Sequence, residues 1–167
     1  EGYYEELRGK LDYLLLGMHT YVIHGKLKDS WVVSTENEMI EYARHMEKAI
    51  NSGLFDIVAH PDLYVSSKLR WTNAAMDAAT IICKAALEKD VPLEVNANGI
   101  RKMLPFDKNP KRYRYPYKEF WEVVKFHGNK VMVSSDCHAP EDLDDESMEL
   151  ARKFAKDLDL NVIETIF

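Results

Sequence analysis

Four side chains that can bind a metal ion each follow closely on a short apolar run: His19, His60, Asp136 and His138. Imidazole and carboxylate groups are ligands of divalent transition metals such as Zn, Mn and Fe. Asn96 ends a further apolar run and adds a polar amide to the set. The residue types therefore predict a metal site, provided that the fold brings the ends of these runs together.

Each of these residues, taken singly, also has a purely structural interpretation. Residues 60–62, His-Pro-Asp, can form a turn in which Asp62 caps the following helix. Residues 135–138 can likewise form a loop that begins a helix. The metal interpretation is favoured because all of these positions recur at the same point of successive units.

The apolar runs alternate with amphipathic segments along the chain. The expected strands are 13–18, 55–59, 92–96, 130–135 and 161–166, and the expected helices are 3–11, 35–51, 71–89, 117–127 and 140–158. Thr35 begins its helix with a capping-box sequence, because Glu38 lies three residues later, and Gly53 ends that helix. The alternation predicts an α/β fold with parallel strands, either a β/α barrel or an open doubly wound sheet.

In a β/α barrel the carboxyl ends of the strands carry the active site. The candidate ligands all follow expected strands, so we expect them to meet at that edge. No glycine-rich phosphate loop of the Rossmann or Walker type occurs in the chain, which counts against nucleotide binding.

Four segments resemble, in the same order, motifs of the PHP (polymerase and histidinol phosphatase) family: 16–19, 55–62, 93–101 and 134–138. The first, Leu-Gly-Met-His, resembles the family's strand that ends in a metal histidine. The third, Leu-Glu-Val-Asn-Ala-Asn-Gly-Ile-Arg, closely resembles the segment typical of histidinol-phosphatases. The last is similar to the family's Ser-Asp-Ala-His motif, and the resemblance extends over nearly the whole chain.

The resemblance implies an incomplete, distorted β/α (TIM-like) barrel of the PHP type with up to three metal ions (Zn, Mn or Fe). By analogy His19 and His60 bind one metal, Asp136 a second and His138 a third. Asp136 and Arg101 are the implied catalytic residues. Arg101 also contacts the substrate phosphate, and Asn96 takes part in substrate binding.

The implied reaction is hydrolysis of a phosphate monoester, L-histidinol phosphate, by metal-activated water in histidine biosynthesis. Two alternatives are a phosphodiesterase or nuclease of the same family, and a non-catalytic module with the PHP fold. The family's early His-x-His, His and Glu motifs do not occur in residues 1–167. We therefore expect a single domain that lacks its N-terminal strands, has little activity alone, and exposes a sheet edge that favours homo-oligomers.

Composition narrows the partners and the compartment. A formal net charge of −6 argues against a protein that coats nucleic acid. The segment from Arg101 to Tyr117 is nonetheless basic, which suits attraction of a small phosphorylated substrate. Two cysteines, no signal peptide and no membrane-length apolar run lead us to expect a cytoplasmic protein without a membrane partner.

Overall fold

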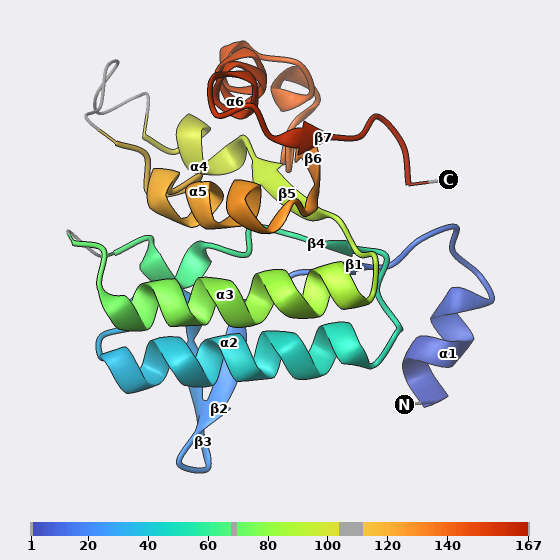
Figure 1. Ribbon diagram of the computed structural model, residues 1–167. Coiled ribbons are helices and arrows are strands. Elements are labelled where there is room, and N and C mark those ends of the chain that lie inside the picture. The colour runs from blue at the N-terminus through green and yellow to red at the C-terminus, as the bar shows by residue number, and fades with distance from the viewer. Residues whose placement is uncertain (1, 68–69, 104–111, 167) are drawn as a thin grey trace.

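The computed structural model describes residues 2–67, 70–103 and 112–166 (Figure 1). The elements follow one another in the order α1 (Gly2–Arg8), β1 (Leu15–Leu16), β2 (Thr20–Ile23), β3 (Lys26–Asp29), η1 (Ser30–Val32), α2 (Glu36–Asn51), β4 (Ile57–Val58), η2 (Leu63–Val65), α3 (Asn73–Glu88), β5 (Leu93–Asn96), α4 (Asn98–Arg101), α5 (Lys118–His127), β6 (Lys130–Ser134), η3 (Pro140–Asp142), α6 (Glu146–Asp157) and β7 (Asn161–Val162), where η denotes a 3₁₀ helix.

Five of the strands form one parallel sheet with the order β1-β4-β5-β6-β7. The order follows the sequence and does not reverse within the described strands, whereas a doubly wound sheet reverses at its switch point. Right-handed crossovers between such neighbours place the connecting helices on one face of the sheet. The predicted α/β fold with a parallel sheet is thus confirmed.

The two faces of the sheet differ in chemistry because side chains alternate along each strand. One row, in register across four strands, lies in the hydrophobic core: Leu16, Val58, Leu93 and Val131. The alternate row carries polar groups at its carboxyl end, namely Glu94, Asn96 and Ser134. It also carries Leu15, which is 44% exposed. The face away from the helices is therefore the one that holds the candidate chemistry.

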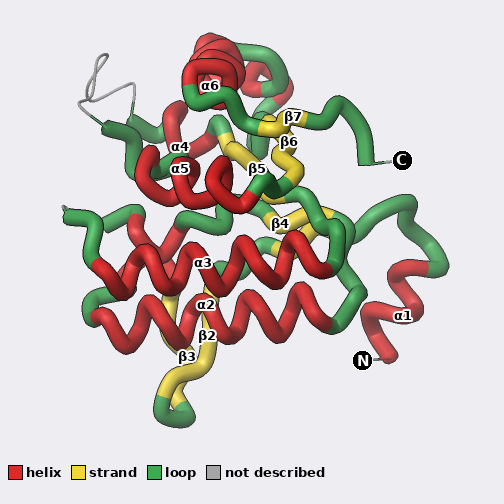
Figure 2. The backbone as a smooth tube through the Cα atoms, in the orientation of Figure 1, coloured by secondary structure: helices red, strands yellow, loops and turns green. Residues whose placement is uncertain are grey.

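Helices α2, α3 and α5 cover the apolar row and lie side by side (Figure 2). The predicted capping box of α2 is confirmed, since the Thr35 side chain accepts from the Glu38 amide and Glu38 bonds back to the Thr35 amide. Met39, Met46 and Ile50 point into the core from this helix. Helix α3 buries mainly alanines, which allows its neighbours to approach closely.

The antiparallel hairpin of β2 and β3 was not predicted. Its turn is formed by His24 and Gly25, both with positive φ (52° and 72°), as a two-residue hairpin of the primed type requires. The strands around the turn are only four residues long. Residues 21–23 of β2 form a short apolar run that the sequence analysis did not use, whereas β3 is polar and largely exposed. The hairpin projects from the body of the molecule (Figure 1).

Several elements are shorter in the structure than the sequence predicted. The strand predicted over 161–166 is confined to 161–162, and the one predicted over 13–18 to 15–16. The helix predicted over 140–158 is divided into η3 and α6, because the Asp145 side chain accepts from the Met148 amide and starts a new helix. Within the described part of the chain, no helix has the length and apolar character needed to cross a bilayer.

Candidate metal centre

Two of the predicted ligands face each other at the carboxyl edge of the sheet. The Nε2 atoms of His19, after β1, and His60, after β4, are 3.2 Å apart. Their rings are stacked with centroids 5.1 Å apart and an interplanar angle of 19°. The sheet therefore brings together two imidazoles that lie 41 positions apart in the sequence.

This distance fits two nitrogens on one metal ion. With metal–nitrogen bonds of about 2.05 Å and tetrahedral angles, two bound nitrogens are separated by about 3.3 Å. Burial, with a smaller contribution from the neighbouring His19, lowers the pKa of His60 to about 4. His60 is therefore neutral at physiological pH, the state that leaves a nitrogen lone pair for a metal. The same distance also allows one ring to donate an N–H to the other.

Glu94 is a site residue that the sequence analysis did not single out. Its side chain is buried and accepts from the His60 amide at 3.0 Å and from Asn96 Nδ2 at 2.9 Å. It also accepts from the Ser134 hydroxyl. Burial raises its pKa, while these donors oppose the rise. A glutamate inside the apolar run 92–95 was the signal available in the sequence.

Asp136 lies beside this network. Its Oδ2 accepts from Asn96 Nδ2 at 3.1 Å and from Asn98 Nδ2 at 3.0 Å. Asp136 and His60 both have positive φ, 45° and 32° respectively. Residues other than glycine seldom adopt a positive φ, and the residues that do are often found at functional sites. Asn96 therefore connects Glu94 to Asp136, and its predicted part in substrate binding stays a prediction.

His138 lies apart from the paired imidazoles. Its side chain is 70% exposed, and its Nδ1 is 2.9 Å from the backbone oxygen of Asp136. Across residues 2–67, 70–103 and 112–166, no three His, Cys, Asp or Glu side chains are grouped so that they could hold a metal ion together. The structure thus places His19 and His60 together with Asp136 nearby, and the metal roles of all four residues stay predictions.

Arg101 connects α4 to the start of α6. Its Nε and one terminal nitrogen donate to the two carboxylate oxygens of Asp145 at 2.7 and 3.0 Å. The guanidinium also donates to the backbone oxygens of Ser135 and Asp142 at 2.9 and 2.8 Å. This pairing lowers the pKa of Asp145. Most donors of Arg101 are thus already engaged, and its contact with phosphate stays a prediction.

Tyr115 forms a wall of the site next to His60. Its ring is buried, with its centroid 6.1 Å from that of His60 and 5.5 Å from that of Trp31. Tyr115 can pack this closely only because residue 99 is glycine. A Cβ at Gly99 would lie 2.3 Å from the Tyr115 carbonyl oxygen. The glycine of the segment 93–101 is thus explained by the close approach of Tyr115.

Of the basic segment that follows Arg101, residues 104–111 lie outside the described residues.

Asp62 binds the start of α5 through its side chain. The alternative structural interpretation, in which Asp62 caps the helix that follows, does not hold for η2, because the Asp62 side chain makes no cap hydrogen bond there. Its Oδ2 instead accepts from the Tyr117 amide at 2.6 Å and from Trp121 Nε1 at 3.0 Å. Burial raises the pKa of Asp62 to about 7. This carboxyl group anchors the start of α5 beneath the candidate centre.

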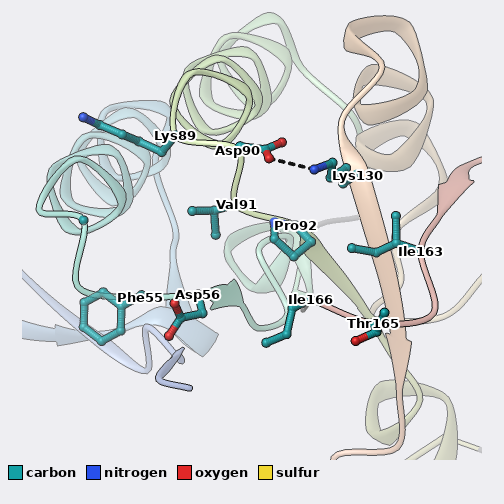
Figure 3. A pocket seen from close by; sticks show the side chains of 11 residues that line it. Phe55, Asp56, Lys89, Asp90, Val91, Pro92, Lys130, Ile163, Thr165 and Ile166 are labelled. Carbon is teal, nitrogen blue, oxygen red and sulfur yellow. Dashed lines mark hydrogen bonds and ion pairs between the residues drawn. The ribbon is translucent and has the colours of Figure 1, made fainter. Parts of the chain in front are cut away.

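A cavity of about 360 Å³ opens at the opposite edge of the sheet (Figure 3). Asp56, Pro92 and Lys130 line it near the amino ends of β4, β5 and β6, and Lys130 pairs with Asp90 at 2.7 Å. Ile163 and Ile166 reach it from the segment after β7. In β/α proteins this edge serves stability, so we assign the cavity no part in the candidate centre.

The histidine pair, the buried glutamate and the strained aspartate form one connected group at the carboxyl edge of the sheet. Neither the models of known protein families nor the curated proteins give a match to this chain.

Proposed function

We propose that the chain is part of a metal-dependent phosphoesterase of the PHP type, and that its substrate is a phosphate monoester, L-histidinol phosphate. The observation that carries the proposal is the pair of imidazole nitrogens 3.2 Å apart at the carboxyl edge of a parallel sheet. The resemblance of the four sequence segments supplies the reaction and the substrate.

His19 and His60 are the residues that would hold one metal ion. Asp136 would bind a second metal ion or orient the attacking water, and its Oδ2 accepts hydrogen bonds from Asn96 and Asn98. Glu94 holds the His60 backbone in place. A bound divalent ion would lower the pKa of a coordinated water and offset charge on the phosphate.

The sheet supports a barrel origin. Its strand order increases along the chain, and its face away from the helices carries both the polar cluster and the exposed Leu15. In a distorted β/α barrel that face is the interior. We accordingly propose that the described strands are one part of such a barrel and that further strands complete its metal sites.

A cytoplasmic location belongs to the same proposal. Cys83 is buried and Cys137 exposed, and neither forms a disulfide. Reduced thiols are the ordinary state in a reducing compartment.

The test is metal content together with release of phosphate from histidinol phosphate. Both are measured on this chain and on a form that carries the sequence upstream of Glu1. We expect His60→Ala to lower zinc or manganese content at least tenfold, because one of the two paired nitrogens is lost. His127→Ala, at the end of α5, is the matched control and should retain the metal.

Two results would overturn the proposal. One is a metal content that is the same in the wild type, His60→Ala and His127→Ala. The other is an extended, metal-loaded protein that releases no phosphate from any monoester.

A further inference from the structure

The guanidinium of Arg101 bonds to both ends of the segment that joins β6 to α6. The Arg101 side chain is only 16% exposed. At the start of the segment it donates to the Ser135 carbonyl oxygen and to the Ser135 hydroxyl, both at 2.9 Å. At the end it donates to the Asp142 carbonyl oxygen at 2.8 Å and to the Asp145 carboxylate at 2.7 and 3.0 Å. One side chain of α4 therefore holds the two ends of this segment relative to each other.

These bonds engage nearly all of the donors that an arginine has. A guanidinium offers five N–H groups. Nε bonds to Asp145 and Nη1 to Ser135, while Nη2 faces three acceptors, which engage both of its hydrogens. At most one N–H, on Nη1, is left, whereas a bidentate grip on phosphate needs two. Arg101 can therefore grip a phosphate in this way only by releasing part of the segment.

The segment carries Asp136 directly after Ser135. Asp136 has a positive φ of 45°, and a strained backbone persists only where the surrounding contacts hold it. Asn96 and Asn98 donate to its carboxylate, and Arg101 holds the residue before it through two hydrogen bonds. The conformation of Asp136 thus depends on the contacts of Arg101.

The other end of the segment fixes His138. Asp142 Oδ2 accepts from the His138 amide at 3.2 Å. The Asp142 carbonyl oxygen accepts from Arg101 and from the Ser135 hydroxyl. Loss of the guanidinium would therefore loosen both candidate metal ligands of the segment.

We propose that Arg101, paired with Asp145, is a positioning residue and does not contact the substrate phosphate. It holds residues 135–145 in the conformation that places Asp136 near the histidine pair. The inference rests on the proposed function, because it takes Asp136 as part of the metal centre, and it replaces the phosphate contact that the resemblance implies for Arg101.

Hydrogen exchange, followed by NMR on this chain without metal, tests the positioning directly. We expect Arg101→Gln and Asp145→Asn each to speed exchange of the hydrogen-bonded amides within residues 138–143 about tenfold, as loss of a hydrogen bond to a charged group would. The double variant should add little, because both changes remove the same contact. Asparagine also caps helices well, so Asp145→Asn removes the ion pair and keeps the start of α6. Arg152→Gln, which breaks the exposed pair with Asp144, is the control and should change nothing.

Kinetics separate positioning from a phosphate contact. On the metal-loaded protein that carries the upstream sequence, positioning predicts that Arg101→Gln and Asp145→Asn both lower kcat for a phosphate monoester about tenfold with little change in KM. A phosphate contact predicts a raised KM in Arg101→Gln alone, since Asp145→Asn frees the guanidinium. Arg101→Lys should be as impaired as Arg101→Gln, because an ammonium lacks the planar fork that bonds to several acceptors at once.

Unchanged exchange in both single variants, or a raised KM confined to Arg101→Gln, would overturn the positioning role. A wild-type protein that binds no metal and releases no phosphate would overturn the proposed function. The exchange rates are read without metal or turnover, so the two failures are distinguishable.

Discussion

Gly99 is the residue at which one added methyl group would meet the backbone of the site wall. A Cβ there would lie 2.3 Å from the Tyr115 carbonyl oxygen and 2.4 Å from its ring. Backbone cannot move aside as a flexible side chain can, so Tyr115 would have to shift, and with it the contacts to His60 and Trp31.

Gly99→Ala should therefore destabilise the protein by about 1–3 kcal/mol, the range typical of overpacking at a buried position. Urea unfolding followed by circular dichroism measures the change. Gly2→Ala is the control, since nothing lies within 4 Å of a Cβ at Gly2. Equal stability of the two variants would show that Tyr115 is less tightly held than the structure indicates.

Asp62 is a buried carboxyl group whose pKa is raised to about 7 from an ordinary value of 3.8. The folded protein binds this proton more tightly than the unfolded chain. The contribution to stability is thus fully present below pH 3.8 and is lost as the pH rises through 7.

Asp62→Asn should remove this loss and leave the variant more stable than the wild type at pH 8 by a few kcal/mol. One amide oxygen can still accept from Tyr117 and Trp121, because both donors use the same oxygen in the wild type. Thermal unfolding at pH 5 and pH 8 provides the measurement, with the exposed Asp77→Asn as control. If the unfolding temperature of Asp62→Asn changed with pH as much as that of the wild type does, the raised pKa of Asp62 would be contradicted.

At the scale of elements, the start of α2 depends on an ionised group. Glu38 accepts from the amides of Ser34 and Thr35 and pairs with Lys28. The hydrogen bond with Lys28 is the largest cause that lowers the pKa of Glu38 to about 2 from 4.5. The stabilisation is present above pH 4.5 and is lost as the pH falls through 2.

Glu38→Gln should lower the free energy of unfolding by about 1 kcal/mol at pH 7, the usual worth of a capping interaction. The difference from the wild type should shrink between pH 4.5 and 2, as the wild-type carboxylate takes up its proton. Glu36→Gln removes an exposed charge from the same first turn and should have little effect. A difference that persists at pH 2 would show that the ion pair and its charge are not responsible.

The sequence predicted the elements with long periodic patterns and the edge at which the polar residues meet. Helix α2 was recognisable from its capping box, and the strands of the sheet from their apolar runs. The hairpin was missed because its strands are short and β3 is polar and exposed, although the apolar residues 21–23 of β2 were an available signal. The contacts of Arg101 and Asp62 were not predictable, since their partners lie 44 and 59 positions away and spacing alone does not specify them.

For the molecule as a whole, the sheet edge at β1 and the exposed face next to it favour association. Within the described residues β1 pairs only with β4, and Leu15 and Tyr13 beside it are 44% and 49% exposed. An edge with open hydrogen-bonding groups and apolar side chains is a site for pairing with another chain.

Sedimentation velocity should consequently show a mass above that of one chain at high concentration. Leu15→Lys should reduce the association, because charge on an edge opposes strand pairing. Leu87→Lys, at a position 50% exposed on α3, should not reduce it. A monomer at all concentrations would rule out the edge as an interface.

The order of the strands also bears on how the chain acquires its structure during synthesis. Each strand from β4 to β7 pairs with the parallel strand just before it in the sheet, so a new unit needs only neighbours that the ribosome has already released. Long-range pairing slows folding because a large loop must close first, and here each closure spans one strand–helix unit. The sheet can therefore grow by stepwise addition, and the carboxyl edge that bears His19 is completed only when the segment with Asp136 arrives.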